Sequence, residues 1–340
     1  MSAMNPCGLA GIDFVEFASR DPRVLHELFL ELGFSRVMEH PKRAVDLYRQ
    51  GDITFLLDRD PASHAAAFEK MHGPCIASMG WRTSSSAHDA ARAAFDRGAT
   101  LARSEYDGLT AIRGIGDSLI HFVPVGASLG FVDCARPDRV PEKGFVAIDH
   151  LTNNVGLGQL AKWADFYKTI FGFTEVRYFD IRGIKTGLVS YALRSPDGSF
   201  CIPINEGTEA KSQINEYLEE YRGPGIQHLA LSTKDILASL RALDGTKHLG
   251  FLDIDRDYYA DLRERFPSVK EDFAEIEKRN VLVDGDAEGY LLQIFTKNLV
   301  GPIFIEMIQR ENHLSFGEGN FGALFRSIER DQARRGYLEA

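Results

Sequence analysis

The sequence predicts an α+β protein of two similar modules, and three observations lead to this prediction. The chain of 340 residues is about twice as long as a typical domain. Apolar periodicity places strands and helices in the order β-α-β-β-β in each half. Short motifs of the first half also recur in the second half in the same order, which indicates an internal duplication.

The first half reads as a strand and a helix, then three short strands, a second helix and a closing hairpin. In chain order we expect these elements at 11–19, 21–35, 44–58 (two strands around a Gly51-Asp52 turn), 75–83, 86–99 and 109–124. The first helix presents apolar residues at helical spacing and ends at Gly33.

The second half repeats this plan. Residues 144–155 match 8–19 around a shared Ile-Asp dipeptide, and the helical segment 158–173 again ends in Gly-Phe. Further matches join 223–233 to 73–83 and 301–308 to 116–123. Residues 134–143 are rich in proline and charge and are interpreted as a linker. We therefore expect an N-terminal module at 1–133 without a metal site and a catalytic module at 144–340.

Composition argues against several kinds of partner. The formal net charge of −10 disfavours nucleic acids and anionic membranes, because both bind basic surfaces. The four cysteines are scattered, without a Cys-x-x-Cys pair, as is usual in a reducing compartment. The N-terminus lacks a signal-peptide pattern, and no apolar run approaches the roughly 18 residues of a membrane span. We expect a soluble, cytoplasmic protein with no nucleic-acid or membrane partner.

Glu306 is the most unusual residue of the second half. It lies within Ile303–Ile308, whose apolar residues on both faces predict a strand buried on both sides. A buried carboxylate costs several kcal/mol unless a cation or a proton compensates it. Since no Lys or Arg stands two positions away, a metal ion is one candidate.

The alignment of the two halves nominates further ligands. Three strand centres of the second half carry His150, His228 and Glu306, where the first half has Phe14, Ser78 and His121. Two histidines and one carboxylate form the facial triad of non-haem Fe(II) oxygenases. Zinc accepts the same set, so these residues alone leave the metal open. His121 has no such partners and is interpreted as structural.

Uncharged polar and aromatic side chains of the same half are suited to a polar aromatic ligand. The polar ones, which can donate and accept hydrogen bonds, are Ser190, Asn205, Gln213, Gln227 and Gln293. The candidate apolar walls are Phe295, Phe304, Phe316 and Phe321. The last of these opens a segment, 321–330, with apolar residues on one helical face.

Several separated motifs together resemble the 4-hydroxyphenylpyruvate dioxygenase family, especially its bacterial members. They are IDHLTNNV, TGLVSYAL, IPINE, KSQI, GIQHLAL, LLQIFTKNLVGPIFIEMIQR and FGEGNFGALFRSIERDQARRG, in the order of the family. The resemblance covers most of 144–340, and the first half resembles the family only in layout. It implies two modules of the vicinal oxygen chelate type, each of paired βαβββ units curling into a half-open barrel, with a C-terminal gating helix.

The resemblance also implies a reaction and a set of roles. Fe(II), held by His150, His228 and Glu306, would convert 4-hydroxyphenylpyruvate and O2 to homogentisate and CO2 in tyrosine and phenylalanine breakdown. Catalytic roles are implied for Gln227, Gln293 and Phe321. Together with the aromatic walls, the expected substrate-binding residues are Ser190, Asn205, Gln213, Phe295, Phe304, Phe316 and Asn320. Gly317 and Gly319 would let the preceding loop swing, and the protein is expected to be a homo-oligomer, a dimer or a tetramer.

Three alternatives stay open at this point. Hydroxymandelate synthase would share the iron and the substrate, but its relatives replace the gate phenylalanine with a smaller aliphatic residue, so Phe321 favours ring hydroxylation. A glyoxalase-like isomerase or an extradiol cleavage enzyme would accept the ligands but leaves FGEGNF and KSQI unexplained. A ligand-sequestering protein of the same fold would not need three metal ligands.

Overall fold

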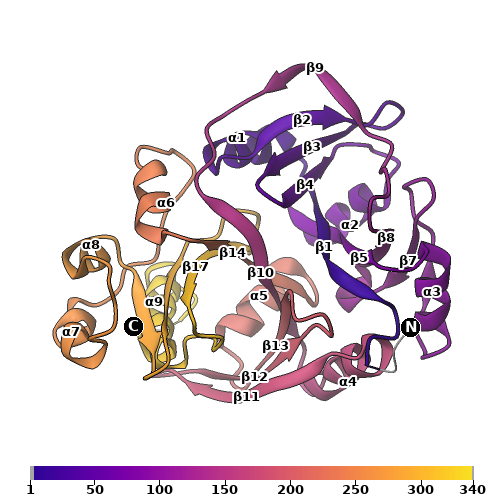
Figure 1. The fold of residues 1–340 in the computed structure, drawn as a ribbon. Helices are drawn as coiled ribbons and strands as arrows, with labels where there is room; N and C mark the ends of the chain where they lie inside the picture. Colours follow the sequence, from indigo (N-terminus) through magenta and orange to yellow (C-terminus); the bar gives the residue numbers. More distant parts are fainter. Residues whose placement is uncertain (1–3, 339–340) are drawn as a thin grey trace.

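The computed structural model describes residues 4–338, which form two curved sheets side by side (Figure 1). The first sheet contains β1 (Leu9–Ala18), β2 (Ser35–Glu39), β3 (Val45–Gln50), β4 (Ile53–Asp58), β5 (Cys75–Thr83), β6 (Leu101–Ala102), β7 (Thr110–Arg113), β8 (Leu119–Pro124) and β9 (Val132–Asp138). Its helices are α1 (Pro22–Glu31), α2 (His64–His72) and α3 (Ala87–Phe95).

The second sheet has a similar set of elements. Its strands are β10 (Phe145–Val155), β11 (Thr174–Arg182), β12 (Gly187–Arg194), β13 (Cys201–Gly207), β14 (Gly225–Thr233), β15 (Leu282–Gly285), β16 (Tyr290–Phe295) and β17 (Phe304–Glu311). The helices are α4 (Leu160–Phe171), α5 (Gln213–Tyr221), α6 (Ile236–Ala242), α7 (Leu262–Arg265), α8 (Phe273–Lys278) and α9 (Phe321–Arg334).

Each sheet contains two βαβββ units, as the sequence predicts, and the first sheet has β9 as an additional edge strand. The strand orders are 6-7-8-5-1-4-3-2-9 and 11-12-13-10-14-17-16-15. In each case the first strands of the two units, β1 with β5 and β10 with β14, pair antiparallel at the centre. The half-barrel architecture of the vicinal oxygen chelate fold is therefore present twice in the chain.

The predicted linker is partly a strand. Its residues 134–138 belong to β9, which pairs with β2 at the edge of the first sheet. Both faces of this edge strand are largely exposed, so its sequence lacks the apolar alternation that reveals a half-buried strand. Pro137 is tolerated because an edge strand leaves one row of N–H groups unpaired.

The two halves share a hydrophobic core. The ring of Trp81 in β5 lies 4.8 Å from that of Phe171 in α4, and 5.8 Å and 5.2 Å from those of Phe173 and Phe200 (centroid distances). Trp81 is fully buried by these contacts. Because aromatic rings bury much apolar surface, this cluster fixes the first half against the second.

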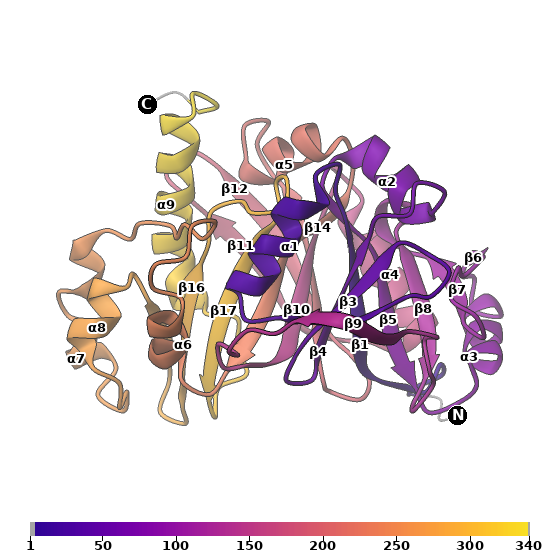
Figure 2. The ribbon, with the colours of Figure 1, turned by 90° about the horizontal axis from the view of Figure 1, so that it is seen from above.

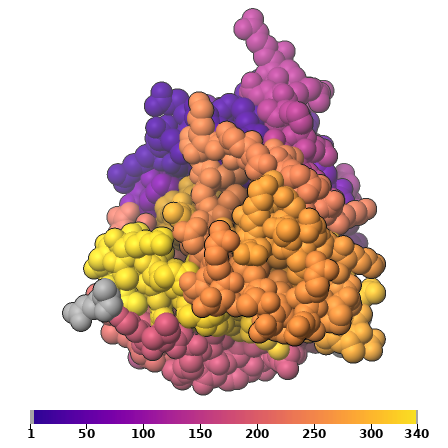
Figure 3. All heavy atoms as spheres, turned by 90° about the vertical axis from the view of Figure 1, so that its left-hand side faces the viewer, coloured from indigo at the N-terminus to yellow at the C-terminus, as the bar shows by residue number. Residues whose placement is uncertain are grey.

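Helix α9 stands at the end of the molecule farthest from the first sheet (Figure 2). In the space-filling view of that end, the orange segment that carries α7 and α8 lies beside the yellow C-terminal segment (Figure 3). Ser327 and Arg330 of α9 both donate to the carbonyl oxygen of Asp253 in this orange region. Among residues 4–338, every helix is too short or too polar to span a bilayer.

Candidate metal centre

His150, His228 and Glu306 converge on one point although 156 positions separate the first from the last. They lie on the adjacent strands β10, β14 and β17. His150 Nε2 lies 3.3 Å from His228 Nε2 and 3.1 Å from Glu306 Oε2, and His228 Nε2 lies 3.4 Å from the same oxygen. Among residues 4–338 they form the one group of three potential ligand atoms within 4.8 Å of one another.

The electrostatics of this group are those of a cation site. Burial favours neutral Glu306, but the charges and hydrogen bonds of His150 and His228 outweigh it and lower the pKa of Glu306 to about 2. Burial likewise opposes charge on His150, yet Glu306 and Asp149 raise the pKa of its imidazole to about 9. Burial lowers the pKa of His228. The ionised carboxylate of Glu306 thus faces two imidazole nitrogens, an arrangement that suits a bound metal ion.

A cavity opens beside the three side chains. Nine of the ten other predicted site residues line it, namely Ser190, Asn205, Gln213, Gln227, Gln293, Phe295, Phe304, Phe316 and Phe321. Sequence reasoning did not assign other lining residues to the site, among them Thr152, Phe179, Ile181, Leu188 and Pro203. Within residues 4–338, Glu306 and the two histidines are the ionisable side chains of this wall.

Asn320 is the predicted pocket residue that lies behind the wall instead of in it. Its side chain is 1% exposed and donates from Nδ2 to Gln293 Oε1 over 3.0 Å. Its Oδ1 lies 2.7 Å from the hydroxyl of Tyr258. Asn320 is therefore placed to support Gln293 rather than to contact a ligand.

The predicted amides at the opposite side form a loose chain. Gln227 Oε1 lies 3.2 Å from Nδ1 of His228, and 3.5 Å from the Nδ2 of Asn205. Gln227 Nε2 in turn lies 3.5 Å from Oε1 of Gln213. These long contacts leave donors and acceptors available to a polar group entering the cavity.

Helix α9 closes the cavity with Phe321, Leu324, Phe325 and Ile328. The ring of Phe321 packs edge-to-face on Phe179 at 5.3 Å. The far half of the helix is anchored, because Glu329 accepts hydrogen bonds from the backbone N–H groups of residues 184–186, each at 3.0 Å. The wall contributed by α9 is thus a helix whose C-terminal half is fixed to the β11–β12 turn.

The glycines before α9 have a packing role. Gly317 has φ +77°, and a Cβ there would collide with the side chain of Gln293. A Cβ at Gly319 would lie 2.5 Å from Oδ1 of Asp284. Glycine is therefore required at both positions because the backbone passes close to the side chains of Gln293 and Asp284. The movement of this loop stays a prediction.

The strand register supports the sequence alignment of the two halves. In the second half, His150 pairs with Ala230 of β14, and Ala230 pairs with Glu306 of β17. In the first half, Phe14 pairs with Gly80 of β5, and Gly80 pairs with His121 of β8. Two positions further along, Thr152 pairs with His228, and this pair corresponds to Glu16 with Ser78. Phe14, Ser78 and His121 therefore occupy the positions equivalent to the three candidate ligands.

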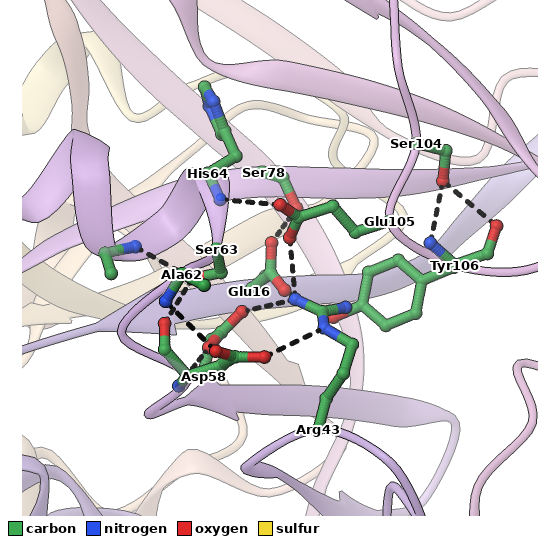
Figure 4. A network of polar contacts seen from close by, with 12 residues as sticks. Glu16, Arg43, Asp58, Ala62, Ser63, His64, Ser78, Ser104, Glu105 and Tyr106 are labelled. Carbon is green, nitrogen blue, oxygen red and sulfur yellow. Dashed lines mark hydrogen bonds and ion pairs between the residues drawn. The ribbon is translucent and has the colours of Figure 1, made fainter.

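A different polar network fills this place in the first half (Figure 4). Glu16 accepts hydrogen bonds from Ser78 Oγ at 2.5 Å and from the hydroxyl of Tyr106. Arg43 lies over the Tyr106 ring, 5.0 Å from its centroid, and forms ion pairs with Asp58 at 2.8 Å and Glu105 at 2.6 Å. An arginine thus supplies the positive charge that compensates these carboxylates.

His121 is buried within the same region. Its Nδ1 lies 3.1 Å from Ser104 Oγ, and burial lowers the pKa of its imidazole to about 3. The ring is therefore neutral at physiological pH and held by a hydroxyl, as expected for a structural histidine.

Comparisons with known proteins place the chain in a family. Residues 3–127 match the N-terminal domain of hydroxyphenylpyruvate dioxygenase, and residues 147–273 match the glyoxalase/bleomycin resistance protein/dioxygenase superfamily. The expectation that the first half resembles the family only in layout was therefore wrong.

Relatives align over nearly the whole chain. The chain is 54% identical to protein MelA of Shewanella colwelliana over 99% of both chains. It is 42% identical to 4-hydroxyphenylpyruvate dioxygenase of Legionella pneumophila, covering 100% of this chain and 99% of the relative. The fold is shared with a variant of 4-hydroxymandelate synthase from Streptomyces coelicolor (TM-score 0.82, 24% identity, 95% and 99% of the two chains). The chain belongs to the 4-hydroxyphenylpyruvate dioxygenase family.

Proposed function

We propose that this protein is a non-haem Fe(II) dioxygenase that converts 4-hydroxyphenylpyruvate and O2 to homogentisate and CO2. The observation that carries the proposal is the convergence of His150, His228 and Glu306 at one end of a cavity lined by aromatic rings and amides. Family membership over the full chain supports the same reaction. One O2 is consumed for each CO2 released, and both atoms of O2 enter the products.

The three side chains suit Fe(II). His150, His228 and Glu306 would hold the metal through two imidazoles and one carboxylate, the ligand set of non-haem Fe(II) oxygenases. When bound, the iron would supply the activation of O2 and the oxidising power of the reaction. With one carboxylate ligand the site would keep a single net positive charge, which matches the single negative charge of an α-keto acid.

The remaining wall is suited to a phenol. Phe295, Phe304 and Phe316 offer apolar surfaces to an aromatic ring. Ser190, Asn205 and Gln213 offer uncharged donors and acceptors to a neutral hydroxyl group. These residues bind and orient the ring so that its reacting carbon faces the metal end of the cavity.

Helix α9 excludes water from this space. Phe321 and Phe325 turn apolar surface inward, and Gln293 is held against Glu306 from behind by Asn320. A closed apolar site protects a strong oxidant from side reactions with solvent.

The proposal extends to location and assembly. All four cysteines are buried free thiols, as suits a reducing compartment, and we propose the cytoplasm.

Exposed apolar side chains at the edge strand β11 and the turn after it, Val176, Tyr178 and Ile184, support a homo-oligomer, a dimer or a tetramer. Light scattering of the purified protein measures this state.

The test is O2 uptake by anaerobically purified, Fe(II)-loaded protein given 4-hydroxyphenylpyruvate, with products separated by chromatography. Homogentisate and CO2 in equal amounts are expected. Formation of 4-hydroxymandelate instead would agree with the proposed iron site but would contradict hydroxylation of the aromatic ring. Bound iron without any O2 uptake would contradict dioxygenase function and favour the isomerase or ligand-binding alternatives.

A further inference from the structure

The Ile-Asp dipeptide shared by the two halves has a specific place in the second half. Asp149 directly precedes His150 in β10, and its Oδ2 lies 2.8 Å from His150 Nδ1. A carboxylate can only accept here, so the proton of the ring sits on Nδ1. His150 Nε2 is thereby left to face His228 and Glu306, as a metal ligand must.

Arg310 fixes this carboxylate from the other side. It lies in β17, and its Nε and Nη2 donate to the two oxygens of Asp149 over 2.7 Å and 2.9 Å. The two side chains are only 17% and 15% exposed. A planar, two-pronged contact of this kind orients the carboxylate as well as attracting it.

The third nitrogen of Arg310 binds the loop that leads to α9. Nη1 donates to the backbone carbonyls of His313 at 3.0 Å and Ser315 at 2.5 Å. The next residue, Phe316, lines the cavity, with its ring 5.7 Å from that of His150 and 5.9 Å from the guanidinium carbon. The side chain of Arg310 therefore connects Asp149, which holds His150, to the backbone of the loop before α9.

We propose that Asp149 and Arg310 are positioning residues that couple the closed position of loop 312–317 to the ligating orientation of His150. The inference rests on the proposed iron site and adds two residues to it. When the loop is closed, Arg310 is held by four acceptors and Asp149 keeps the proton on Nδ1 of His150. When the loop opens, Arg310 loses two of these acceptors, and the carboxylate is less firmly held.

The first half provides a matched control. Asp13 occupies the equivalent place before Phe14 and forms an ion pair with Arg82 of β5 over 3.0 Å. Asp13 is the aspartate of the Ile-Asp dipeptide in the first half, and the residue after it is Phe14, where the second half has His150. Removing it tests the loss of an ion pair near the centre of a sheet without touching the candidate metal centre.

The experiment compares Asp149→Asn, Arg310→Gln and Arg310→Lys with Asp13→Asn and Arg82→Gln. Anaerobic Fe(II) affinity is measured by competition with a chromophoric chelator, and hydrogen exchange of 312–320 is measured with and without Fe(II). Circular dichroism checks that each variant is folded.

We expect Asp149→Asn to weaken Fe(II) binding about 10–100-fold, because an amide can donate to Nδ1 and allow the wrong tautomer. Arg310→Gln should weaken binding in the same direction and speed exchange in 313–317. Arg310→Lys should not rescue exchange, since one ammonium cannot span the carboxylate and both carbonyls. The two control variants should bind Fe(II) like the wild type.

The outcomes separate this inference from the proposed function. Wild-type protein that binds no Fe(II) would overturn the iron site itself. Wild-type protein that binds Fe(II) while Asp149→Asn and Arg310→Gln bind it equally well would overturn only the coupling. In the wild type alone, Fe(II) should slow exchange of 313–317, and an unchanged rate would contradict the coupling even if a variant failed to fold.

Discussion

Gln293 donates a hydrogen bond from Nε2 to Oε1 of Glu306 over 2.9 Å. Its own Oε1 accepts from Asn320, the residue directly before α9, and Asn320 Oδ1 lies 2.7 Å from the hydroxyl of Tyr258. That hydroxyl also accepts from the backbone N–H of Val283 at 2.8 Å. The start of α9 is thus connected to a candidate metal ligand through two amides, and to β15 through a tyrosine.

Tyr258→Phe should loosen the start of α9 without changing the metal ligands. Losing one partly buried hydrogen-bonding hydroxyl costs about 1 kcal/mol of unfolding free energy. We expect faster hydrogen exchange in 318–324 and a raised KM, with unchanged Fe(II) affinity. Steady-state kinetics and exchange mass spectrometry measure these effects.

The neighbouring Tyr259 is a matched control for this variant. Its hydroxyl is buried and has no hydrogen-bond partner within the described part of the chain. Tyr259→Phe should therefore leave KM and exchange unchanged. Equal effects from the two variants would show that the Tyr258–Asn320 contact does not hold the helix.

His228→Ala should abolish both iron retention and turnover. Only one imidazole and a carboxylate would remain, and the buried charge of Glu306 would lose a partner 3.4 Å away. Iron content after desalting and O2 uptake are the measurements. His121→Ala, which removes the buried histidine of the first half, should bind iron normally, and a variant of His228 with full activity would contradict the ligand assignment.

The sequence was sufficient to predict most of the fold and the convergence of the three candidate ligands. Repetition makes this possible, because equivalent positions in two copies of one unit must occupy equivalent places in the sheets. Asp149 and Arg310 could not be paired in this way, since 161 positions separate them and no local pattern links them. Tyr258 lies in a stretch without clear periodicity, and β9 is an edge strand with little buried surface.

The first half should show a pH-dependent contribution to stability from Asp58, whose side chain is fully buried. Burial and the charge of Glu16 raise the pKa of Asp58 from 3.8 to about 7, although Arg43 opposes this shift. The folded state therefore binds this proton more tightly than the unfolded state. The resulting stabilisation is fully present below pH 3.8 and is lost as pH rises through 7.

Replacing Asp58 by Asn should remove this dependence. The free energy of unfolding of the wild type minus that of Asp58→Asn should fall between pH 4 and pH 8, because the proton that favours the folded wild type is lost in this range. Urea denaturation of the two proteins across this range measures the difference. A difference that stays constant or grows with pH would show that Asp58 is ionised in the folded protein throughout.

Phe321→Leu should change the product of the reaction. The phenylalanine ring lines the cavity and packs on Phe179 at 5.3 Å, so we expect it to confine the substrate's aromatic ring near the metal end. A smaller aliphatic side chain removes this edge-to-face contact and leaves the substrate side chain free to approach the reacting position. We expect 4-hydroxymandelate beside homogentisate, at a turnover reduced about tenfold, with CO2 still released once per O2.

Arg326→Ala, on the more exposed side of the same helix, should yield homogentisate alone. Homogentisate as the sole product of Phe321→Leu would mean that the rest of the cavity wall, and not this ring, directs oxygen to the aromatic carbon.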